Sequence, residues 1–357
     1  MHIPPELRCQ PHANPLVPDN GEEHVEDSYA LICPQGCRVP VVNGISRFVG
    51  SSNYASAFGL QWNKFRRTQL DSYTGTTISR DRLAGALGGS LDVVRGKSVL
   101  EVGCGAGRFT EVLLSAGARV FACDLSEAVE ANYANCGHLP DYFICQADIM
   151  QLPASPLSFD VVLCLGVIQH TPNPEATIAT LAQYVKPGGM LAIDHYSYEY
   201  PYTFSRRILR QLLIRLPATL SERVTHTLAR VLLPLHKALR SKKWLLGSKR
   251  RGVARLRHYL RIERLRHTLL KFSPLVDYYD GYPQLGDKLL EETMILDTHD
   301  TLTDYYKHFR SVEEIQYCLA SLGLTEIEVY QGGNGVEARA KRPIQDITQT
   351  VSGVGGP

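Results

Sequence analysis

The residues best suited to hold a ligand form a glycine-rich loop. A β-branched run over 97–102 leads into Glu101-Val-Gly-Cys-Gly-Ala-Gly107, and a helical pattern follows from about Arg108. Glycines between a strand and a helix let the backbone approach a ligand closely. A dinucleotide fingerprint requires its third glycine at the position of Arg108, so the nicotinamide and flavin pattern fails here. Taken alone, the loop is also compatible with a structural turn.

Acidic residues follow the next two predicted strands. Asp124 follows a strand at about 118–123, where a carboxylate can accept hydrogen bonds from both ribose hydroxyls. Asp148 follows a strand at about 142–146 and could accept a hydrogen bond from an exocyclic amino group, while Ile149 would flank a purine ring. The spacing therefore predicts a nucleoside site beside the glycine loop.

Candidate acid–base residues follow the fourth and fifth predicted strands. They are Gln169 and His170 after the fourth strand, and Asp194, His195 and Tyr196 at the end of the fifth. Ligands of open α/β sheets bind outside the carboxyl ends of the strands. His170 is the best base by residue type, although it could instead pack against a cofactor or cap the next turn. His195 is the second candidate, with Asp194 able to orient or charge it.

Two pairs of metal-ligand residues lie near the N-terminus. Cys9-Gln-Pro-His12 and Cys33-Pro-Gln-Gly-Cys37 have about the spacing of a zinc ribbon, in which each of two turns supplies two ligands. The pattern departs from a regular ribbon because one ligand is histidine and the second pair is separated by three residues. Either zinc binds here, or the ribbon is held by its apolar contacts alone.

Composition excludes several classes of protein. Of the 357 residues, 44% are hydrophobic and 21% charged, which suits a packed core and not a wholly disordered chain. Apolar runs are far shorter than the roughly 20 residues that cross a bilayer, and no signal-peptide pattern is seen. Nine cysteines, an odd number, do not suggest a disulfide framework. We expect a cytoplasmic protein, with peripheral association at the inner membrane as an alternative.

One segment is strongly basic. Residues 206–271 carry 19 Lys and Arg against Glu222 and Glu263, a net charge of +17, which leaves −15 for the rest of the chain. Leucines and isoleucines are interleaved with the arginines, as in helices that lie at a membrane interface. The alternatives are a helical lid with solvated charges, or a segment that binds nucleic acid. Aromatic residues in or beside the segment are few (Trp244, Tyr259 and Phe272), which weakens a single-strand stacking platform.

Composition and pattern divide the chain into parts. These are a β-rich N-terminal module at 1–49, a helical lid at 50–96, an α/β domain at 97–342 with a basic helical insertion at 197–300, and a tail at 343–357 that we expect to be disordered. Within the domain, β-rich runs alternate with helical stretches, which indicates βαβ units and a parallel sheet. The insertion falls between the fifth and sixth strands.

Local signals place further elements. The pattern predicts a helix over Tyr54–Leu70 and a later helix for which Ser79 is a candidate N-cap. Ser311-Val-Glu-Glu314 has the form of a capping box that opens a helix to about Leu322. Two strands are expected after it, near 324–330 and 335–341.

Taken in order, these motifs resemble those of class I S-adenosylmethionine-dependent methyltransferases. The segments that carry the resemblance are Val99-Leu-Glu-Val-Gly-Cys-Gly-Ala-Gly-Arg108, Asp124, Ala147-Asp148, Phe159-Asp160 and Lys186-Pro-Gly-Gly189. The resemblance implies a Rossmann-like seven-stranded sheet with helices on both faces, closed by a hairpin that contributes one antiparallel strand. It implies that Asp124 holds the ribose and Asp160 serves the fold. It also implies that the methionine moiety is held by Glu101, Gly103, Gly105 and Gly107, and the adenine by Asp148 and Ile149.

The resemblance implies an S-adenosylmethionine-dependent methyltransferase. We expect methyl transfer by in-line displacement to a small-molecule, glycan or lipid-linked acceptor, a reaction in which positioning of the two reactants supplies much of the catalysis. The alternatives are an RNA methyltransferase, or a non-catalytic cofactor-binding module that docks on a membrane or an acidic partner through the basic insertion.

Overall fold

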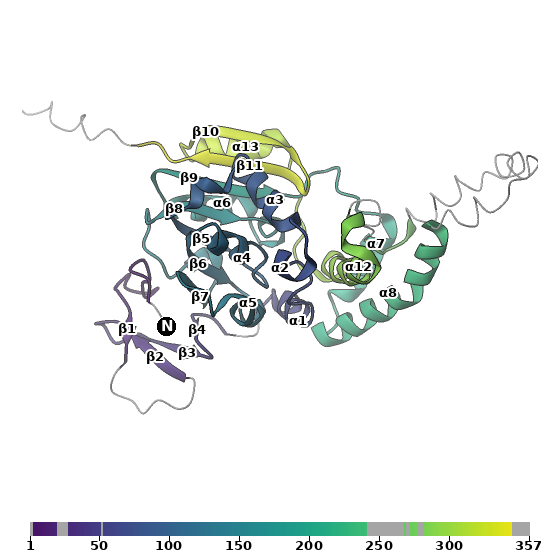
Figure 1. Cartoon of the computed structure of the whole chain (residues 1–357), viewed down its shortest axis with the longest axis horizontal. Coiled ribbons are helices and arrows are strands. Elements are labelled where there is room, and N and C mark those ends of the chain that lie inside the picture. Colours follow the sequence, from purple (N-terminus) through teal and green to yellow (C-terminus); the bar gives the residue numbers. More distant parts are fainter. Residues whose placement is uncertain are drawn as a thin grey trace, which may run out of the picture. The chain divides into compact units, whose positions relative to one another are not determined.

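The computed structural model describes residues 3–19, 28–50, 53–240, 268, 272–276 and 282–344. The chain divides into two compact units (Figure 1). We call them the sheet unit, which comprises residues 1–53, 77–200 and 306–357, and the helical unit, which comprises 54–76 and 201–305. Each is described by itself below.

The sheet unit contains one mixed sheet of eleven strands. The strands are β1 (Val17–Pro18), β2 (Ser28–Ile32), β3 (Arg38–Val42), β4 (Ile45–Arg47), β5 (Ser98–Val102), β6 (Arg119–Asp124), β7 (Tyr142–Gln146), β8 (Phe159–Cys164), β9 (Val185–His195), β10 (Thr325–Gly332) and β11 (Gly335–Lys341). Their spatial order is β1-β2-β3-β4-β7-β6-β5-β8-β9-β11-β10. From β4 to β9 the neighbours in this order are parallel, and β11 pairs antiparallel with β9.

The sheet is longer than the seven strands expected. The run from β7 to β10 has the predicted form, with parallel strands followed by a hairpin that contributes the antiparallel β11. The extra strands come from the N-terminal segment, where Ser46 and Arg47 of β4 pair in parallel register with Cys145 and Gln146 of β7. The predicted N-terminal module therefore continues the main sheet.

Ten α-helices and four short 3-10 helices are described. The α-helices are α1 (Ser56–Lys64), α2 (Asp71–Thr74), α3 (Ile78–Ala86), α4 (Arg108–Ser115), α5 (Ala128–Cys136), α6 (Pro174–Tyr184), α7 (Phe204–Leu213), α8 (Ala218–Arg240), α12 (Gly286–Thr303) and α13 (Val312–Ser321). The 3-10 helices are η1 (Leu91–Val94), η2 (Ile149–Gln151), η3 (Ile168–His170) and η4 (Pro283–Leu285).

Local signals placed some helix ends well and others poorly. The capping box is confirmed, because Ser311 and Glu314 exchange side-chain and backbone hydrogen bonds at the start of α13. The long helix expected over 54–70 is shorter, and α1 ends at Lys64. Ser79 is not an N-cap: α3 begins one residue earlier, and the Ser79 hydroxyl accepts a hydrogen bond from Arg108 Nε at 3.0 Å.

Two hydrophobic cores lie on the two faces of the sheet. Successive strand residues point to opposite faces, and along β6 Phe121 packs in one core while Val120 and Ala122 pack in the other. Helices α6 and α13 cover the first core, and α3, α4 and α5 cover the second (Figure 1). The arrangement leaves the carboxyl ends of the parallel strands as one continuous edge.

Asp160 has the structural role that the resemblance implied. Its Oδ2 accepts hydrogen bonds from the backbone N–H of Ser98 at 2.9 Å and from the Ser98 hydroxyl at 2.8 Å. Lys186 Nζ lies 3.2 Å from the same oxygen. The carboxylate thus ties the beginnings of β5, β8 and β9 together, away from the ligand edge.

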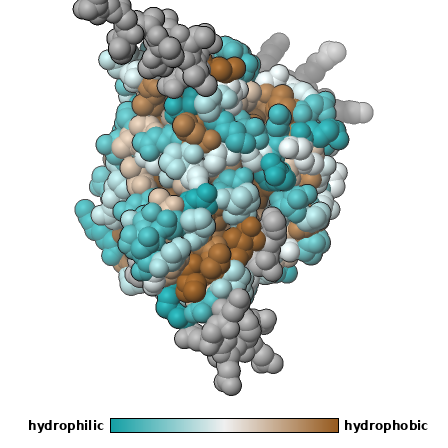
Figure 2. Space-filling view, turned by 90° about the vertical axis from the view of Figure 1, so that its left-hand side faces the viewer, coloured by the Kyte–Doolittle hydropathy of each residue, from teal (hydrophilic) through white to brown (hydrophobic). Residues whose placement is uncertain are grey.

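The N-terminal segment packs as part of the sheet unit. Leu7, Cys9 and Leu31 are buried in the same core as the central strands, and the backbone N–H of Arg8 donates to the carbonyl of Pro153 at 2.9 Å. Figure 2 shows this side of the molecule, where hydrophilic residues cover most of the surface and a hydrophobic band lies beside the lower grey segment.

The helical unit draws its elements from two distant stretches of sequence. It combines α1 and α2 with α7, α8 and α12, so residues 54–76 pack with 201–305, whereas α3 belongs to the sheet unit. The structure therefore divides the predicted lid at 50–96. No helix in the described part of the chain is long and apolar enough to cross a membrane. Trp244, Tyr259 and most of the tail at 343–357 fall outside the described residues.

Candidate active site

The glycine loop between β5 and α4 depends on its glycines. Gly103, Gly105 and Gly107 have φ values of 72°, 51° and 96°, in the left-handed region that side chains rarely adopt. A Cβ at Gly103 would lie 2.2 Å from Val167 Cγ2. The N–H groups of Gly103 and Cys104 both donate to the carbonyl of Cys123, at 2.7 and 3.1 Å, which fixes the loop against β6.

Glu101 places a buried carboxyl group beneath this loop. Its side chain is 3% exposed, and Oε2 accepts a hydrogen bond from the Thr110 hydroxyl of α4 at 2.6 Å. Burial raises the pKa of Glu101 to about 8, against the opposing effect of the Thr110 hydrogen bond, and the nearby Asp124 carboxylate raises it further. A carboxyl group in this state is well suited to a cationic ligand group, which would stabilise its ionised form.

Asp124 ends β6 and faces the glycine loop. The backbone N–H of Gly105 donates to Oδ2 at 3.0 Å, and the Ser126 N–H and hydroxyl donate to Oδ1 at 2.8 and 2.7 Å. Burial raises the pKa of Asp124. Because a carboxylate offers about four lone-pair sites, these three bonds orient the group and leave one site, on Oδ2, for a ligand.

Asp148 and Ile149 lie beside Asp124, as the parallel register requires. The backbone N–H of Ala147 donates to the carbonyl of Asp124 at 3.0 Å, which brings the ends of β6 and β7 together. Asp148 Oδ1 caps η2 by accepting from the Met150 N–H at 2.8 Å, and Ile149 is buried. The residues predicted to contact a nucleoside therefore share one edge of the sheet with the glycine loop.

His170 lies in η3, at the carboxyl end of β8. Its Nδ1 lies 3.2 Å from the backbone carbonyl of Tyr306, and its ring packs edge-on against Tyr196 with centroids 5.3 Å apart. A carbonyl can only accept, so Nδ1 carries the hydrogen and the neutral ring has its lone pair on Nε2. The neighbouring Gln169 is fully buried, and its amide atoms have no hydrogen-bond partner among the residues described.

Asp194 does not orient His195, contrary to one part of the expectation, although its charge raises the pKa of His195 against the effect of burial. Adjacent strand residues point to opposite faces, and the Asp194 carboxylate turns toward α3, where it pairs with Arg82 and accepts from the Gly166 N–H and, at 3.1 Å, from Asn334 Nδ2. The carboxylate thus connects α3, the β8 loop and the β10–β11 turn. We therefore assign it a positioning role.

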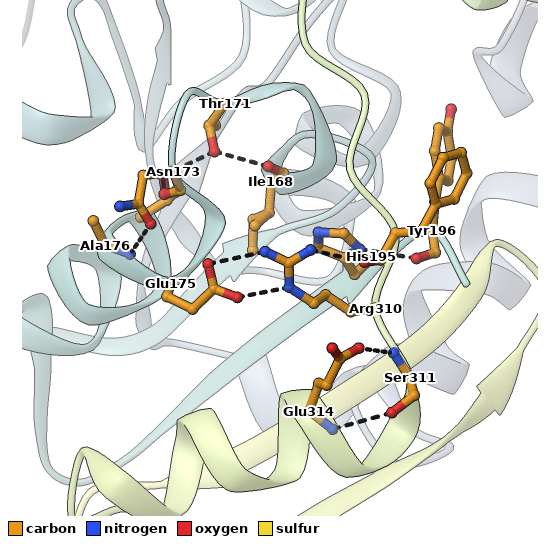
Figure 3. A network of polar contacts seen from close by, with 12 residues as sticks. Ile168, Thr171, Asn173, Glu175, Ala176, His195, Tyr196, Arg310, Ser311 and Glu314 are labelled. Carbon is orange, nitrogen blue, oxygen red and sulfur yellow. Dashed lines mark hydrogen bonds and ion pairs between the residues drawn. The ribbon is translucent and has the colours of Figure 1, made fainter. Parts of the chain in front are cut away.

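His195 lies on the face covered by α6 and α13 (Figure 3). Its Nδ1 lies 2.9 Å from the Tyr196 carbonyl, and burial lowers the pKa of His195 to about 4. The charge of Arg310, which forms an ion pair with Glu175 at 2.6 Å, contributes to this lowering of the pKa of His195. An imidazole with so low a pKa is a weak general base near neutral pH.

The segment 306–310, which sequence reasoning overlooked, completes this side of the edge. The His308 N–H donates to the Gln169 carbonyl at 3.0 Å, and the Arg310 N–H donates to the Tyr196 carbonyl at 2.9 Å. Lys307 Nζ lies 5.0 Å from the ring centroid of Tyr196. The only sequence signal was a cluster of aromatic and basic residues just before the capping box.

The four N-terminal metal-ligand candidates meet in space. Candidate ligand atoms of Cys9, His12, Cys33 and Cys37 all lie within 4.8 Å of one another, and His12 Nδ1 is 3.1 Å from Cys37 Sγ. Each pair is held by a tight turn. The Ala13 N–H donates to the Cys9 carbonyl at 2.9 Å, and the Gly36 N–H donates to the Cys33 carbonyl at 2.9 Å. Three sulfur atoms and one imidazole nitrogen at this spacing fit a tetrahedral Zn²⁺.

The strand cysteines are core residues. Cys104, Cys123, Cys145 and Cys164 are all buried in or beside the central strands. Burial raises the pKa of Cys104, Cys145 and Cys164 well above the ordinary value. A buried neutral thiol is a poor nucleophile.

Comparison with known proteins matches the same part of the chain. Residues 100–193 match the methyltransferase domain family. The ubiquinone biosynthesis O-methyltransferase of Azoarcus sp. (strain BH72) is 40% identical over 98 residues, which are 26% of this chain and 42% of that protein. The protein of the same name from Coxiella burnetii (strain Dugway 5J108-111) is 39% identical over 101 residues, 28% of this chain and 43% of that protein. The match thus spans less than half the length of these relatives.

Among solved structures, the magnesium protoporphyrin IX methyltransferase from Synechocystis PCC 6803 with bound SAH is 14% identical, with a TM-score of 0.38. The alignment covers 80% of this chain and 94% of that one. The family match and the motifs of the sheet edge agree on the same residues. The part of the chain that builds the sheet edge, residues 100–193, therefore matches a methyltransferase domain.

Proposed function

We propose that this chain transfers the methyl group of S-adenosylmethionine to a hydroxyl of a small-molecule acceptor, with His170 as the general base. The observation that carries the proposal is the gathering of Glu101, Asp124 and Asp148 around the glycine loop, with His170 after the next strand of the same sheet. The matched relatives are named O-methyltransferases of ubiquinone biosynthesis, which supports an oxygen acceptor.

The residues of the edge fit the donor molecule. Glu101 would pair with the ammonium of the methionine moiety, since a buried carboxyl group with a raised pKa favours a cation. Asp124 would accept a hydrogen bond from the ribose, and Asp148 and Ile149 would hold the adenine. Gly103, Gly105 and Gly107 would leave room for the methionine moiety, since all three have positive φ values and a Cβ at Gly103 or Gly107 would crowd Val167 or Cys136. When bound, this donor supplies an electrophilic methyl group on a sulfonium.

His170 would accept the proton that the acceptor loses. The new bond joins the acceptor oxygen to the methyl carbon, the sulfur–carbon bond breaks with its electron pair moving to sulfur, and the hydroxyl proton passes to Nε2 of His170. The Tyr306 carbonyl supports this role because it holds the hydrogen of the neutral ring on Nδ1. His195 is less suited, since burial holds its pKa near 4.

Two features of the segment beside His170 support an acceptor pocket. Gln169 is buried, and its amide lacks a hydrogen-bond partner among the described residues, so it could bind a polar group of the acceptor. Lys307 Nζ stacks over the Tyr196 and Tyr200 rings at 5.0 and 5.1 Å, which places a positive charge near His170. This charge favours an acceptor that carries an acidic group. Glycan and lipid-linked acceptors of that kind remain alternatives.

We also propose that Cys9, His12, Cys33 and Cys37 bind a structural Zn²⁺. The cluster supports this because all four ligand atoms converge from two turns. Zinc would fasten the turns at the N-terminal end of the sheet, a role separate from methyl transfer.

Paired substitutions test the base assignment. His170→Ala and His195→Ala should each retain affinity for S-adenosylmethionine, measured by calorimetry, because neither contacts the proposed donor site. Only His170→Ala should lose turnover in a screen of phenolic and carboxylated hydroxyl acceptors with methyl-labelled donor, by roughly 10²–10⁴-fold. Loss of turnover in His195→Ala but not in His170→Ala would overturn the assignment of His170 as the general base.

The same purified protein tests the wider proposal. Methyl transfer to RNA would overturn the proposal of a small-molecule acceptor. Donor binding without transfer to any acceptor class would favour the non-catalytic module.

A further inference from the structure

Helix α8 of the helical unit exposes several apolar side chains and buries several polar ones. Its buried side chains include Ser221, Thr225, His226 and His236, alongside the apolar Ala229 and Leu233. Its exposed side chains include Leu220, Val224, Val231 and Leu235, with exposed fractions of 43, 39, 69 and 53%. A surface helix normally turns its apolar stripe to the core and its polar residues to solvent.

Helix α7 also exposes apolar side chains. Phe204, Ile208 and Leu212 recur every four residues, so they share one face, and they are 68, 46 and 56% exposed. Arg206 is instead buried, and its guanidinium donates to the carbonyls of Pro201 and Leu275, each at 2.6 Å. Apolar residues are thus exposed on both helices, while several polar or charged side chains are buried.

Exposed arginines accompany these apolar residues. Arg223 and Arg230 of α8 are exposed, as is Arg215 in the turn between α7 and α8. Glu222, the one acidic residue between 204 and 240, forms an ion pair with Lys64 at 2.7 Å. The surface is therefore apolar and positively charged together, which is the combination that binds an anionic membrane interface.

Other binding partners fit the exposed surface of α7 and α8 less well. Nucleic-acid phosphates would pair with the arginines but would leave the leucine and phenylalanine side chains in water. A second copy of this chain would bring like charges together. No helix in the described ranges can span a bilayer, so the contact would lie on the membrane surface.

We propose that the exposed face of α7 and α8, defined by Phe204, Ile208, Leu212, Val231 and Leu235 with the flanking arginines, binds the surface of an anionic lipid bilayer. The apolar side chains reach the boundary of the acyl chains, and the arginines contact headgroup phosphates. This contact holds whether or not the proposed methyl transfer is correct.

Flotation of the full chain with lipid vesicles tests the proposal. Vesicles of phosphatidylcholine alone are compared with vesicles that also contain phosphatidylglycerol, and free inorganic phosphate serves as a competitor that lacks acyl chains. We expect flotation only with the anionic vesicles, weakened by salt and little affected by phosphate. Equal flotation with both vesicle types, or none with either, would overturn the proposal.

Two sets of variants separate the apolar and charged contributions. Ile208→Ser with Leu212→Ser should abolish flotation, and Arg215→Gln with Arg223→Gln and Arg230→Gln should lower the partition coefficient roughly a hundredfold, at about fivefold per arginine. Tyr317→Ser is the matched control, since Tyr317 is 78% exposed but lies in α13 of the sheet unit.

Circular dichroism checks that each variant is folded. If the serine variant does not fold, the glutamine variant still decides the question. Retained flotation in both variants would contradict the proposal. If the wild type does not float but binds RNA, and this binding needs the arginines but not Ile208 and Leu212, the partner of this surface is nucleic acid and the lipid proposal is wrong. If the wild type self-associates without floating, and the serine variant does not self-associate, the partner of this surface is a second copy of the chain and the lipid proposal is wrong.

Discussion

Donor binding should release a proton from Glu101. With a pKa of about 8 in the free protein, Glu101 is about nine-tenths protonated near pH 7. Pairing with a ligand ammonium requires the ionised carboxylate, so binding drives the proton off. A ligand α-amino group with a pKa near 8 takes up roughly a tenth of a proton as its charged form is stabilised. The expected net release is therefore about 0.8 of a proton per site.

Calorimetry measures this release directly. Titrations of S-adenosylmethionine near pH 7 in phosphate and in Tris differ in observed enthalpy by the released protons multiplied by the difference in buffer ionisation enthalpy. In Glu101→Gln the difference should vanish and the affinity should fall. Asp160→Asn is a matched control, because Asp160 is a carboxylate at the opposite ends of the strands. Proton release below about 0.2 in the wild type, or unchanged release in Glu101→Gln, would refute the assignment.

The same shift has a consequence for stability. The pKa of Glu101 is raised from 4.5 to about 8 on folding, so the stabilisation is complete below about pH 4.5 and is lost as pH rises through 8. Each pH unit in that window removes up to about 1.4 kcal/mol from the free energy of unfolding. Glu101→Gln should therefore melt at a higher temperature than the wild type near pH 8, in the absence of ligand. If Glu101→Gln and the wild type melt at the same temperature near pH 4.5 and also near pH 8, the raised pKa of Glu101 is contradicted.

Three further perturbations follow from the contacts described. Gly103→Ala should lower the free energy of unfolding by about 1–3 kcal/mol more than Gly96→Ala in urea titrations. Both glycines have left-handed φ values (72° and 69°), but only a Cβ at Gly103 would clash with a neighbour. Equal losses in the two variants would contradict the clash. Asp194→Ala should lower the free energy of unfolding by about 2–3 kcal/mol, because it removes the ion pair with Arg82 and the acceptor of the Gly166 N–H. A loss below about 0.5 kcal/mol would contradict the positioning role. Cys33→Ser should lower the zinc content of the purified protein from one ion per chain and lower its melting temperature, and a zinc-free wild type would refute the metal site.

The central fold could be predicted because its signals are local. Each parallel strand is a short β-rich run that ends in a turn or an acidic residue, and the Ser311–Glu314 capping box marks its helix within four residues. The glycine loop and Asp124 were placed together because parallel strands present their carboxyl ends at one edge.

The remaining features depend on long-range contacts. The pairing of β4 with β7 joins residues about 100 positions apart, and no local pattern at Ser46 indicates it. Whether Asp194 reaches His195 or Arg82 is decided by strand alternation, which adjacency in sequence concealed. The approach of Tyr306 to His170 likewise joins elements 136 positions apart, across the whole insertion.

The central claim is that the sheet edge binds S-adenosylmethionine through its acidic residues. The measurement that tests it most directly is calorimetric titration of the wild type and of Asp124→Ala with S-adenosylmethionine, with folding checked by circular dichroism. The account predicts saturable binding at one site in the wild type and loss of that binding in the folded variant. No binding to the wild type, or the same affinity in Asp124→Ala, would contradict it.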